Sequence, residues 1–483
     1  MKKIFYFTLT ISSLLLFLSC SEDYLEEKPT ENISTADLEL LNNDAGAKSF
    51  VTAIYSKFLD FNMSSFSWIG MTSIASDDAD KGSSPGDTGT DKDLMDALTY
   101  NSSSLSIKEV YQGNYQGINR CNQALYYIPQ LNNADIALRD RLIGEAKFLR
   151  AFMYFNLVRL YGGVPLVDHI PNPSSETDKA MQLTRRTKED VYAFIEQDLL
   201  AAIDVLPEKG AYSDDEIGRA SRGAALTLLA KVALYQEKWS EVLSYTDQIT
   251  GYSLTPSYAE IFKVSGENNQ ESIFEIQGKT TNPAKGIQGY SATQGARGAG
   301  GWGWGFNTPS ESLLNAYESG DERMNATIIF AGTTLYDGRV VPTTVENPRY
   351  NFKAYSSANT DAWETDINIR YLRFSEVLLM RAEAKNELGQ DPSTELNAVR
   401  NRAGLINSTA SGQAALRAAI WKERRIEFAM EHDRWFDIVR TGQAETALAA
   451  HGKTFIVGKH ELFPLPQQFI NESVGYSIQN PNY

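Results

Sequence analysis

The sequence predicts a mainly α protein, in which a tetratricopeptide-like helical-repeat scaffold carries an inserted, irregular lobe of loops and short strands. Apolar residues recur at helical spacing through most of the chain, and three Ala-rich segments at 145–151, 229–234 and 379–384 resemble one another. Residues 251–365 break this pattern, because they are rich in Gly, Thr, Ser, Asn and Tyr and too long for a simple loop. We therefore expect a single body at 36–483, with the scaffold at about 36–250 and 366–483 and the variable lobe at about 251–365.

The predicted helices follow from apolar periodicity and from residues that cap or end a helix. An apolar stripe over 138–155 predicts a broadly buried helix, which the glycines after Tyr161 should end. Thr187 can cap the next helix, which continues to Val205, by accepting a hydrogen bond from the amide near Asp190. Further helices are expected at 222–236, 239–249, 371–388, 392–403 and 414–439, and residues 61–101 are expected to be irregular.

Two of the Ala-rich helices are each followed by a short break and a second amphipathic helix. The breaks are at 237–238 and 389–391. A helix, a tight turn and a second helix with small residues at the contact are typical of tetratricopeptide-like repeats. The alternative is a chance similarity among alanine-rich helices.

The start of the chain predicts export and lipid attachment. Lys2 and Lys3 precede an apolar run at 4–18, and Ser19 and Cys20 lead into acidic residues. The run is too short to cross a membrane, so residues 1–19 are predicted to be a signal peptide. Cleavage before Cys20 would leave a lipidated cysteine and an acidic tether at 20–35. The alternative is an ordinary secreted protein in which Cys20 is incidental.

Charge argues against one class of function, nucleic-acid binding, and cysteine content argues against a disulfide. The 483 residues include 61 acidic and 45 basic side chains, a formal net charge of −16 that loss of Lys2 and Lys3 makes more negative. Nucleic-acid binding is therefore not expected, because its affinity comes largely from Lys and Arg. Once Cys20 is lipidated, Cys121 has no partner for a disulfide.

No motif in the sequence predicts catalysis or a metal site. The glycine-rich stretch 295–305 lacks the ending of a phosphate-binding loop, and the acidic pairs at 77–78 and 214–215 are expected by chance among 61 acids. We expect no cofactor; a structural calcium ion is compatible with the sequence, but no motif indicates one. The histidines show no metal-ligand spacing; they are His169, His432, His451 and His460.

The most unusual stretch is residues 290–306, where glycines surround Trp302 and Trp304. Glycines allow a tight or mobile loop that presents indoles at a surface, and the apolar face of a pyranose ring stacks on such rings. The alternative is that these tryptophans fill the seam between lobe and helices. The candidate ligand-binding residues are Trp302, Trp304, Arg297, Tyr290, Trp363, Trp68, Asp77, Asp78 and Asn101, the polar members serving sugar hydroxyls.

Charged residues at helical spacing in 423–440 predict a ladder of ion pairs along one helix. The expected pairs are Arg424 with Glu427, Glu431 with Arg434, Arg434 with Asp437, and Asp437 with Arg440.

The same stretch closely resembles the signature helix of the SusD/RagB family of Bacteroidetes outer-membrane nutrient-binding lipoproteins. It reads AIWKERRIEFAMEHDRWFDIVR over residues 419–440, with His432 where the family usually has Gly. Other family-like segments lie at 115–122, 144–151, 160–165, 370–384, 463–466 and 479–483.

This resemblance implies a tetratricopeptide-like scaffold at the cell-surface face of the outer membrane. It also implies a SusC-like TonB-dependent barrel as partner, over which the protein sits as a hinged lid. Because family ligand sites are built from variable loops, the resemblance assigns no binding residue.

The sequence thus favours a non-enzymatic lipoprotein that binds oligosaccharides or polysaccharide and delivers them to the barrel. The alternatives are a RagB-like lipoprotein that captures peptides, a surface-anchored glycoside hydrolase, and a helical scaffold that binds only proteins.

Overall fold

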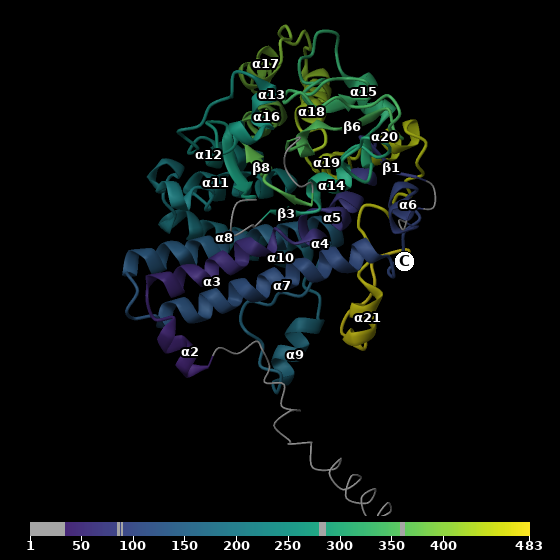
Figure 1. Cartoon of the computed structure of the whole chain (residues 1–483). Helices are drawn as coiled ribbons and strands as arrows, with labels where there is room; N and C mark the ends of the chain where they lie inside the picture. The colour runs from purple at the N-terminus through teal and green to yellow at the C-terminus, as the bar shows by residue number, and fades with distance from the viewer. Residues whose placement is uncertain (1–33, 85–86, 88–89, 280–285, 358–362) are drawn as a thin grey trace, which may run out of the picture.

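The computed structural model describes residues 34–84, 87, 90–279, 286–357 and 363–483. Long helices form one half of the body, and the short strands gather in the other half (Figure 1). The predicted signal peptide, Cys20 and all but the last two residues of the predicted tether lie outside the described residues. Within the described residues, every helix is too short or too polar to cross a membrane.

The helices begin and end as follows. They are α2 (Thr35–Leu40), α3 (Asp44–Lys57), α4 (Phe61–Ser64), α5 (Phe66–Ile69), α6 (Thr90–Asp96), α7 (Leu105–Tyr127), α8 (Ile136–Tyr161), α9 (Glu176–Leu183), α10 (Lys188–Val205), α11 (Arg222–Tyr235), α12 (Trp239–Thr246), α13 (Tyr258–Ile261), α14 (Tyr290–Gln294), α15 (Glu311–Ala316), α16 (Phe374–Glu387), α17 (Ser393–Arg402), α18 (Gln413–Glu427), α19 (Arg434–Arg440), α20 (Ala444–Ala450) and α21 (Gln467–Ser473). A π-helical turn, η2 (Gly70–Ile74), follows α5, and short 3₁₀ turns are η3 (Ile128–Gln130), η4 (Lys209–Ala211), η5 (Asp214–Glu216), η6 (Val264–Gly266) and η7 (Phe352–Ala354).

The caps predicted for two long helices are confirmed. Helix α8 ends at Gly162, whose φ of 73° is a conformation that favours glycine. At α10, the side chain of Thr187 accepts a hydrogen bond from the amide of Asp190, and the Asp190 carboxylate accepts one from the amide of Thr187.

The helical half is a tetratricopeptide-like stack, as predicted. Helices α11 and α12 form one helical hairpin, α16 and α17 form another, and α16 packs on both α12 and α18. Lys231 on α11 is buried and pairs with Glu376 on α16 at 2.9 Å, which ties the two hairpins together. Helices α3, α7, α8 and α10 lie beside them and contribute much of the largest hydrophobic core (Figure 1).

Four antiparallel two-stranded sheets occur among the described residues, and two of them join the lobe to the scaffold. Strand β2 pairs with β8, which leads directly into α16, and β1 pairs with β4. A second hydrophobic core lies within the lobe around Tyr258 and Tyr350. The strands are β1 (Ala79–Gly82), β2 (Ser272–Ile276), β3 (Ile287–Gln288), β4 (Phe306–Pro309), β5 (Ile328–Phe330), β6 (Arg349–Asn351), β7 (Glu364–Thr365) and β8 (Ile369–Arg373).

Two helix predictions need correction. The segment 371–388 begins as strand β8 and becomes helical only at Phe374, because its first residues pair with β2. The segment 414–439 is not one helix: it breaks between α18 and α19, where Met430 and His432 adopt positive φ values of 64° and 70°.

This break also changes the predicted ion-pair ladder. Asp437 pairs with Arg440 at 2.8 Å, as expected, but it also accepts from Arg424 across the break at 3.1 Å. The other carboxylates turn toward different elements: Glu431 contacts Arg373 and Lys353, and Glu427 contacts arginines of the lobe and of neighbouring scaffold elements.

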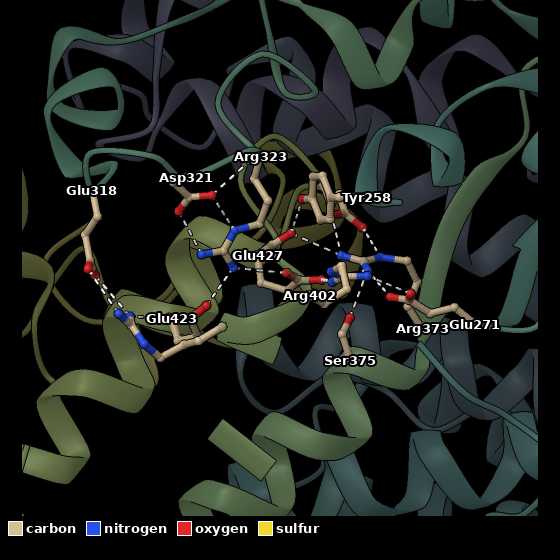
Figure 2. Close-up of polar contacts among 12 residues, drawn as sticks. Tyr258, Glu271, Glu318, Asp321, Arg323, Arg373, Ser375, Arg402, Glu423 and Glu427 are labelled. Atoms are coloured by element: carbon tan, nitrogen blue, oxygen red, sulfur yellow. Dashed lines mark hydrogen bonds and ion pairs between the residues drawn. The ribbon is translucent and has the colours of Figure 1, made fainter. Parts of the chain in front are cut away.

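The junction between lobe and scaffold is a buried network of ion pairs centred on Glu427 (Figure 2). Its carboxylate contacts Arg323 of the lobe at 3.1 Å and Arg373 of β8 at 2.9 Å, and also pairs with Arg402 of α17. Burial opposes ionisation of Glu427, but the charges of these three arginines hold its pKa well below the usual range. Because breaking a buried pair leaves an uncompensated charge, the network favours one position of the lobe on the helices.

Candidate functional site

Four aromatic side chains from separate segments meet at the surface and form an aromatic platform. Its members are Phe61, Phe66, Trp304 and Trp363. Trp304 and Trp363 remain 37% and 39% exposed, with ring centroids 5.7 Å apart. Phe61 lies 5.4 Å from Trp363 and 6.0 Å from Trp304, and Phe66 lies 6.2 Å from Trp304. These separations are typical of favourable aromatic pairs, so the rings support one another while presenting apolar surface to solvent.

A break between two short helices brings the phenylalanines together. Ser65 separates α4 from α5 and leaves helical geometry, with φ −115° and ψ −115°. Its hydroxyl donates to the carbonyl of Gln288 on β3 at 2.7 Å, which holds the break against the lobe. Phe61 and Phe66, which start α4 and α5, consequently stack at 5.7 Å with 25° between their planes.

Gly289 lets the lobe approach these rings closely. Its φ is 69°, and a Cβ built at this position would lie 2.6 Å from a ring carbon of Phe61 and 3.1 Å from one of Trp363. Its amide also donates to the carbonyl of Trp363 at 2.7 Å. A glycine is therefore required both by the backbone and by the contact.

The glycine-rich loop presents Trp304 on a backbone held by hydrogen bonds to α14 and the residues after it. The amide of Trp304 donates to the carbonyl of Ala292 at 2.7 Å, and that of Gly305 donates to Gly295 at 2.9 Å. A Cβ at Gly303 would lie 2.5 Å from the Ala292 oxygen, so the close approach depends on glycine. The loop fixes the position of the Trp304 indole.

Trp302 points to a different environment from Trp304. Its ring lies 5.4 Å from that of Tyr355 and packs on the hydrophobic core of the lobe, with the guanidinium of Arg339 4.7 Å above it. Trp302 therefore packs within the lobe and not in the seam between lobe and helices. Trp304 does contact Phe61 and Phe66 across this seam, but it remains 37% exposed.

Arg297 lies beside the platform in a cluster of charged side chains. Its Nη1 donates to Ser83 Oγ at 2.8 Å and pairs with Asp87, and its Nε is 3.2 Å from Glu346. Ser83 in turn lies 3.0 Å from the carbonyl oxygen of Trp304. Arg297 thus uses most of its N–H groups within the protein.

Two of the predicted ligand contacts are buried aromatic residues. Tyr290 is 3% exposed, and its hydroxyl lies 3.2 Å from Nε2 of His432. Trp68 is also 3% exposed and packs 6.0 Å from Phe436. We correct their assignment, because neither side chain can reach a ligand at the surface.

The same correction applies to the two aspartates, which are each 1% exposed. Asp77 accepts from Arg434 at 2.7 and 2.9 Å, and Asp78 accepts from Arg425 at 2.7 Å. Burial opposes ionisation of Asp77, but Arg434 and Arg425 lower its pKa to about 2, whereas burial raises the pKa of Asp78. Both carboxylates therefore hold the α18–α19 region in place.

Asn101 is exposed but makes only local contacts among those seen in the described structure. Its Oδ1 accepts from the amide of Ser103 at 2.9 Å, just before α7. No described contact joins it to the aromatic platform.

Phe61 and Phe66 were not predicted as site residues. The sequence predicts that residues 61–101 are irregular, but it gives no reason to choose particular side chains among them. Two phenylalanines in a short, irregular segment were the available signal, and their meeting with Trp304 depends on tertiary structure. Within the described parts of the chain, no group of His, Cys, Asp or Glu side chains is arranged to hold a metal ion.

Two family models match the two halves of the chain. Residues 23–234 match a family described as "Starch-binding associating with outer membrane", and residues 270–483 match the SusD family. SusD-like protein P2 of Formosa agariphila is 26% identical over 97% of this chain and 98% of its own.

Solved structures show the same fold. A laminarin-binding SusD-like protein is 28% identical, with a TM-score of 0.77 over 91% of this chain and 100% of its own. Surface glycan-binding protein A from Bacteroides fluxus is 25% identical, with a TM-score of 0.75 over 91% of this chain and 99% of its own. With both halves matched by related models and the whole fold shared, the chain belongs to the SusD/RagB family.

Proposed function

We propose that this protein is a cell-surface lipoprotein that binds oligosaccharides or polysaccharide through the aromatic platform. It then delivers them to a SusC-like TonB-dependent outer-membrane transporter and carries out no catalysis itself. The observation that carries the proposal is the exposed pair Trp304 and Trp363, supported by Phe61 and Phe66.

The chemistry of sugars fits this arrangement. A pyranose presents C–H groups on its faces and hydroxyls at its edge, so its face can stack on an indole while its hydroxyls bond to nearby polar groups. Because the platform is held by backbone hydrogen bonds and ring contacts, little ordering is needed when a ligand binds. The related laminarin-binding protein supports a glycan as the ligand class.

Lipid attachment and the transporter partner rest on the sequence and the family. Cys20 follows a signal-like segment, and the matched family is described as associating with the outer membrane. Several acyl chains, at about 0.8 kcal/mol per buried methylene, would keep the body beside a membrane-embedded partner.

Affinity electrophoresis tests the binding function. The purified mature protein is run in gels that contain laminarin, starch or other polysaccharides. We expect retardation in at least one gel, and we expect Trp304→Ala and Trp363→Ala to weaken it by about 10-fold or more, which corresponds to about 1.4 kcal/mol.

Trp239→Ala is the matched control, because Trp239 starts α12 in the scaffold. Unchanged binding in both platform variants would refute the proposed site, and release of reducing sugar would refute the absence of catalysis. Palmitate labelling tests the anchor: Cys20→Ala should lose the label and Cys121→Ala should keep it.

A further inference from the structure

We propose that Asp87 and Glu346 make the aromatic platform selective for uncharged glycans over glycans that carry carboxylate or sulfate groups. This inference rests on the proposed function and names the substrate class of the same site. Asp87, Glu346 and Arg297 are called here the charged rim.

The charged rim adjoins the platform through Ser83. Its hydroxyl lies 3.0 Å from the carbonyl oxygen of Trp304, and its amide donates to Gly305 at 2.6 Å. Arg297 contacts Ser83 and Asp87 on one side and Glu346 on the other. Ser84 donates to Glu346 at 2.6 Å, which fixes the second carboxylate. A glycan that stacks on the Trp304 indole and continues toward Ser83 would pass over this rim.

The rim has more negative than positive charge. One guanidinium faces two carboxylates, and their side chains are partly exposed, at 30% for Arg297, 24% for Asp87 and 41% for Glu346. Hydrogen bonds from Ser83 and the amide of Ser84, together with Arg297, lower the pKa of Asp87, so it is ionised at neutral pH. The rim thus carries a net charge of about −1 at neutral pH.

Two charged groups beside the platform rings, Glu364 and Lys92, do not reverse this sign. Glu364 directly follows Trp363, and its carboxylate accepts from the amide of Gly286 at 3.0 Å. Lys92 lies 4.0 Å from the ring centroid of Phe66, but it is fully buried and paired with Asp91 at 2.8 Å. A charged sugar that reaches the charged rim would therefore meet its net negative charge.

Ionised carboxylates favour neutral sugars over anionic ones. They accept hydrogen bonds from sugar hydroxyls, and such charge-assisted bonds are stronger than those between neutral groups. An anionic sugar would instead be repelled, and at low ionic strength this repulsion is screened only beyond about 30 Å. The same two carboxylates therefore strengthen the binding of neutral glycans and weaken the binding of anionic ones.

Two matched pairs of polymers test the selectivity: laminarin with carboxymethyl-laminarin, and starch with carboxymethyl-starch. Each pair shares a backbone and differs in charge. At about 10 mM salt we expect the full mature protein to bind the neutral member at least about 5-fold more tightly, and we expect the ratio to fall at high salt.

The variant Asp87→Asn with Glu346→Gln changes the rim charge from about −1 to +1 and releases the guanidinium of Arg297. It should bind the carboxymethylated polymer at least as tightly as the neutral one. Arg297→Gln changes the charge in the opposite direction and should increase the preference for the neutral polymer.

Glu176→Gln with Glu472→Gln is the control. It removes the same number of carboxylate charges, but from α9 and α21, away from the lobe (Figure 1). Circular dichroism verifies that each variant is folded, and Arg297→Gln provides the test if the double variant is not.

The outcomes separate this inference from the proposed function. Equal binding of neutral and charged polymers at low salt, or a rim variant that behaves like the control, overturns the selectivity. Two other results would count against the proposed function and not against the selectivity. They are failure to bind laminarin and starch, and binding of these glucans that Trp304→Ala does not weaken.

Discussion

Trp304 and Trp363 belong to two different loops of the lobe, yet their ring centroids lie 5.7 Å apart and both rings face solvent. Contact with Phe61 fixes them from below, at 6.0 and 5.4 Å respectively. Surface tryptophans that are held in this way expose apolar area without the entropy cost of ordering a loop on binding.

Gly289→Ala should weaken glycan binding although residue 289 need not touch the glycan. The new Cβ would clash with Phe61 and Trp363, so we expect both rings to shift and the affinity to fall several-fold. Affinity electrophoresis measures this effect. Gly251→Ala is the control, because Gly251 has a φ of 84° but no atom within 4 Å of the added Cβ. Equal effects of both variants would show that strain, and not the platform, is responsible.

Trp302→Ala should separate stability from binding. Because Trp302 packs on the lobe core, we expect its loss to reduce the free energy of unfolding by about 2–4 kcal/mol, with folded protein still binding glycan. Trp304→Ala should abolish or weaken glycan binding but reduce the free energy of unfolding by less than about 1 kcal/mol. Urea unfolding followed by affinity electrophoresis measures both quantities. A Trp302→Ala protein of normal stability that no longer binds would place Trp302 in the site.

Glu427→Gln should destabilise the junction between lobe and scaffold. Its carboxylate is shared by Arg323, Arg373 and Arg402, so removing the charge breaks three buried ion pairs at once. Because these arginines keep other carboxylate partners, among them Glu423 and Glu271, we expect a loss of about 3 kcal/mol. Glu318→Gln is the matched control: Glu318 pairs with Arg400 at 3.0 Å but is 36% exposed, and about 1 kcal/mol or less is expected. Similar losses in urea unfolding for the two variants would contradict this role of Glu427.

Acidification below about pH 6.5 should destabilise the protein through His432. Burial lowers the pKa of His432 to about 4, whereas an unfolded histidine titrates near 6.5. As the pH falls from 6.5 to 4, the unfolded chain takes up a proton that the folded protein excludes, so stability is lost across this window by up to about 3 kcal/mol.

The variant His432→Asn tests this dependence, because asparagine tolerates the φ of 70° and does not titrate in this range. Stability measured by urea unfolding should fall less steeply between pH 6.5 and 4 in the variant. An unchanged slope would exclude His432 as the cause.

A second loss should follow at lower pH. Burial opposes ionisation of Asp77, but Arg434 and Arg425 lower its pKa to about 2, so its stabilising charge is complete above about pH 4 and lost as the pH falls toward 2. Asp77→Asn should remove this part of the pH dependence and lower stability at neutral pH.

The helices of the scaffold could be predicted from the sequence because residues close together in the chain determine where they begin and end. The capping box at Thr187, the glycine stop after Tyr161 and the helical hairpins all depend on residues close together in the chain. The errors arose where segments distant in the chain determine the secondary structure. Residues 369–373 form a strand because they pair with β2.

The candidate site shows the same limit. Glycine and tryptophan content drew attention to the loop that carries Trp304, but composition could not distinguish Trp304 from Trp302, which differ in what the fold packs against them. Arg297 is predicted from the sequence to serve sugar hydroxyls, but in the structure it pairs with the carboxylates of Asp87 and Glu346. Phe61 and Phe66 lie close together in the chain, but only the tertiary structure shows that they meet Trp304.

The aromatic platform is divided between the two halves of the molecule: Phe61 and Phe66 come from helices before residue 70, and Trp304 and Trp363 come from the lobe. A chimera that exchanges only the lobe would transfer two of the four rings. These rings would then contact scaffold residues from a different protein. Ligand preference in such hybrids would then depend on how well the two halves match, so new specificities should arise most readily when both segments are exchanged together.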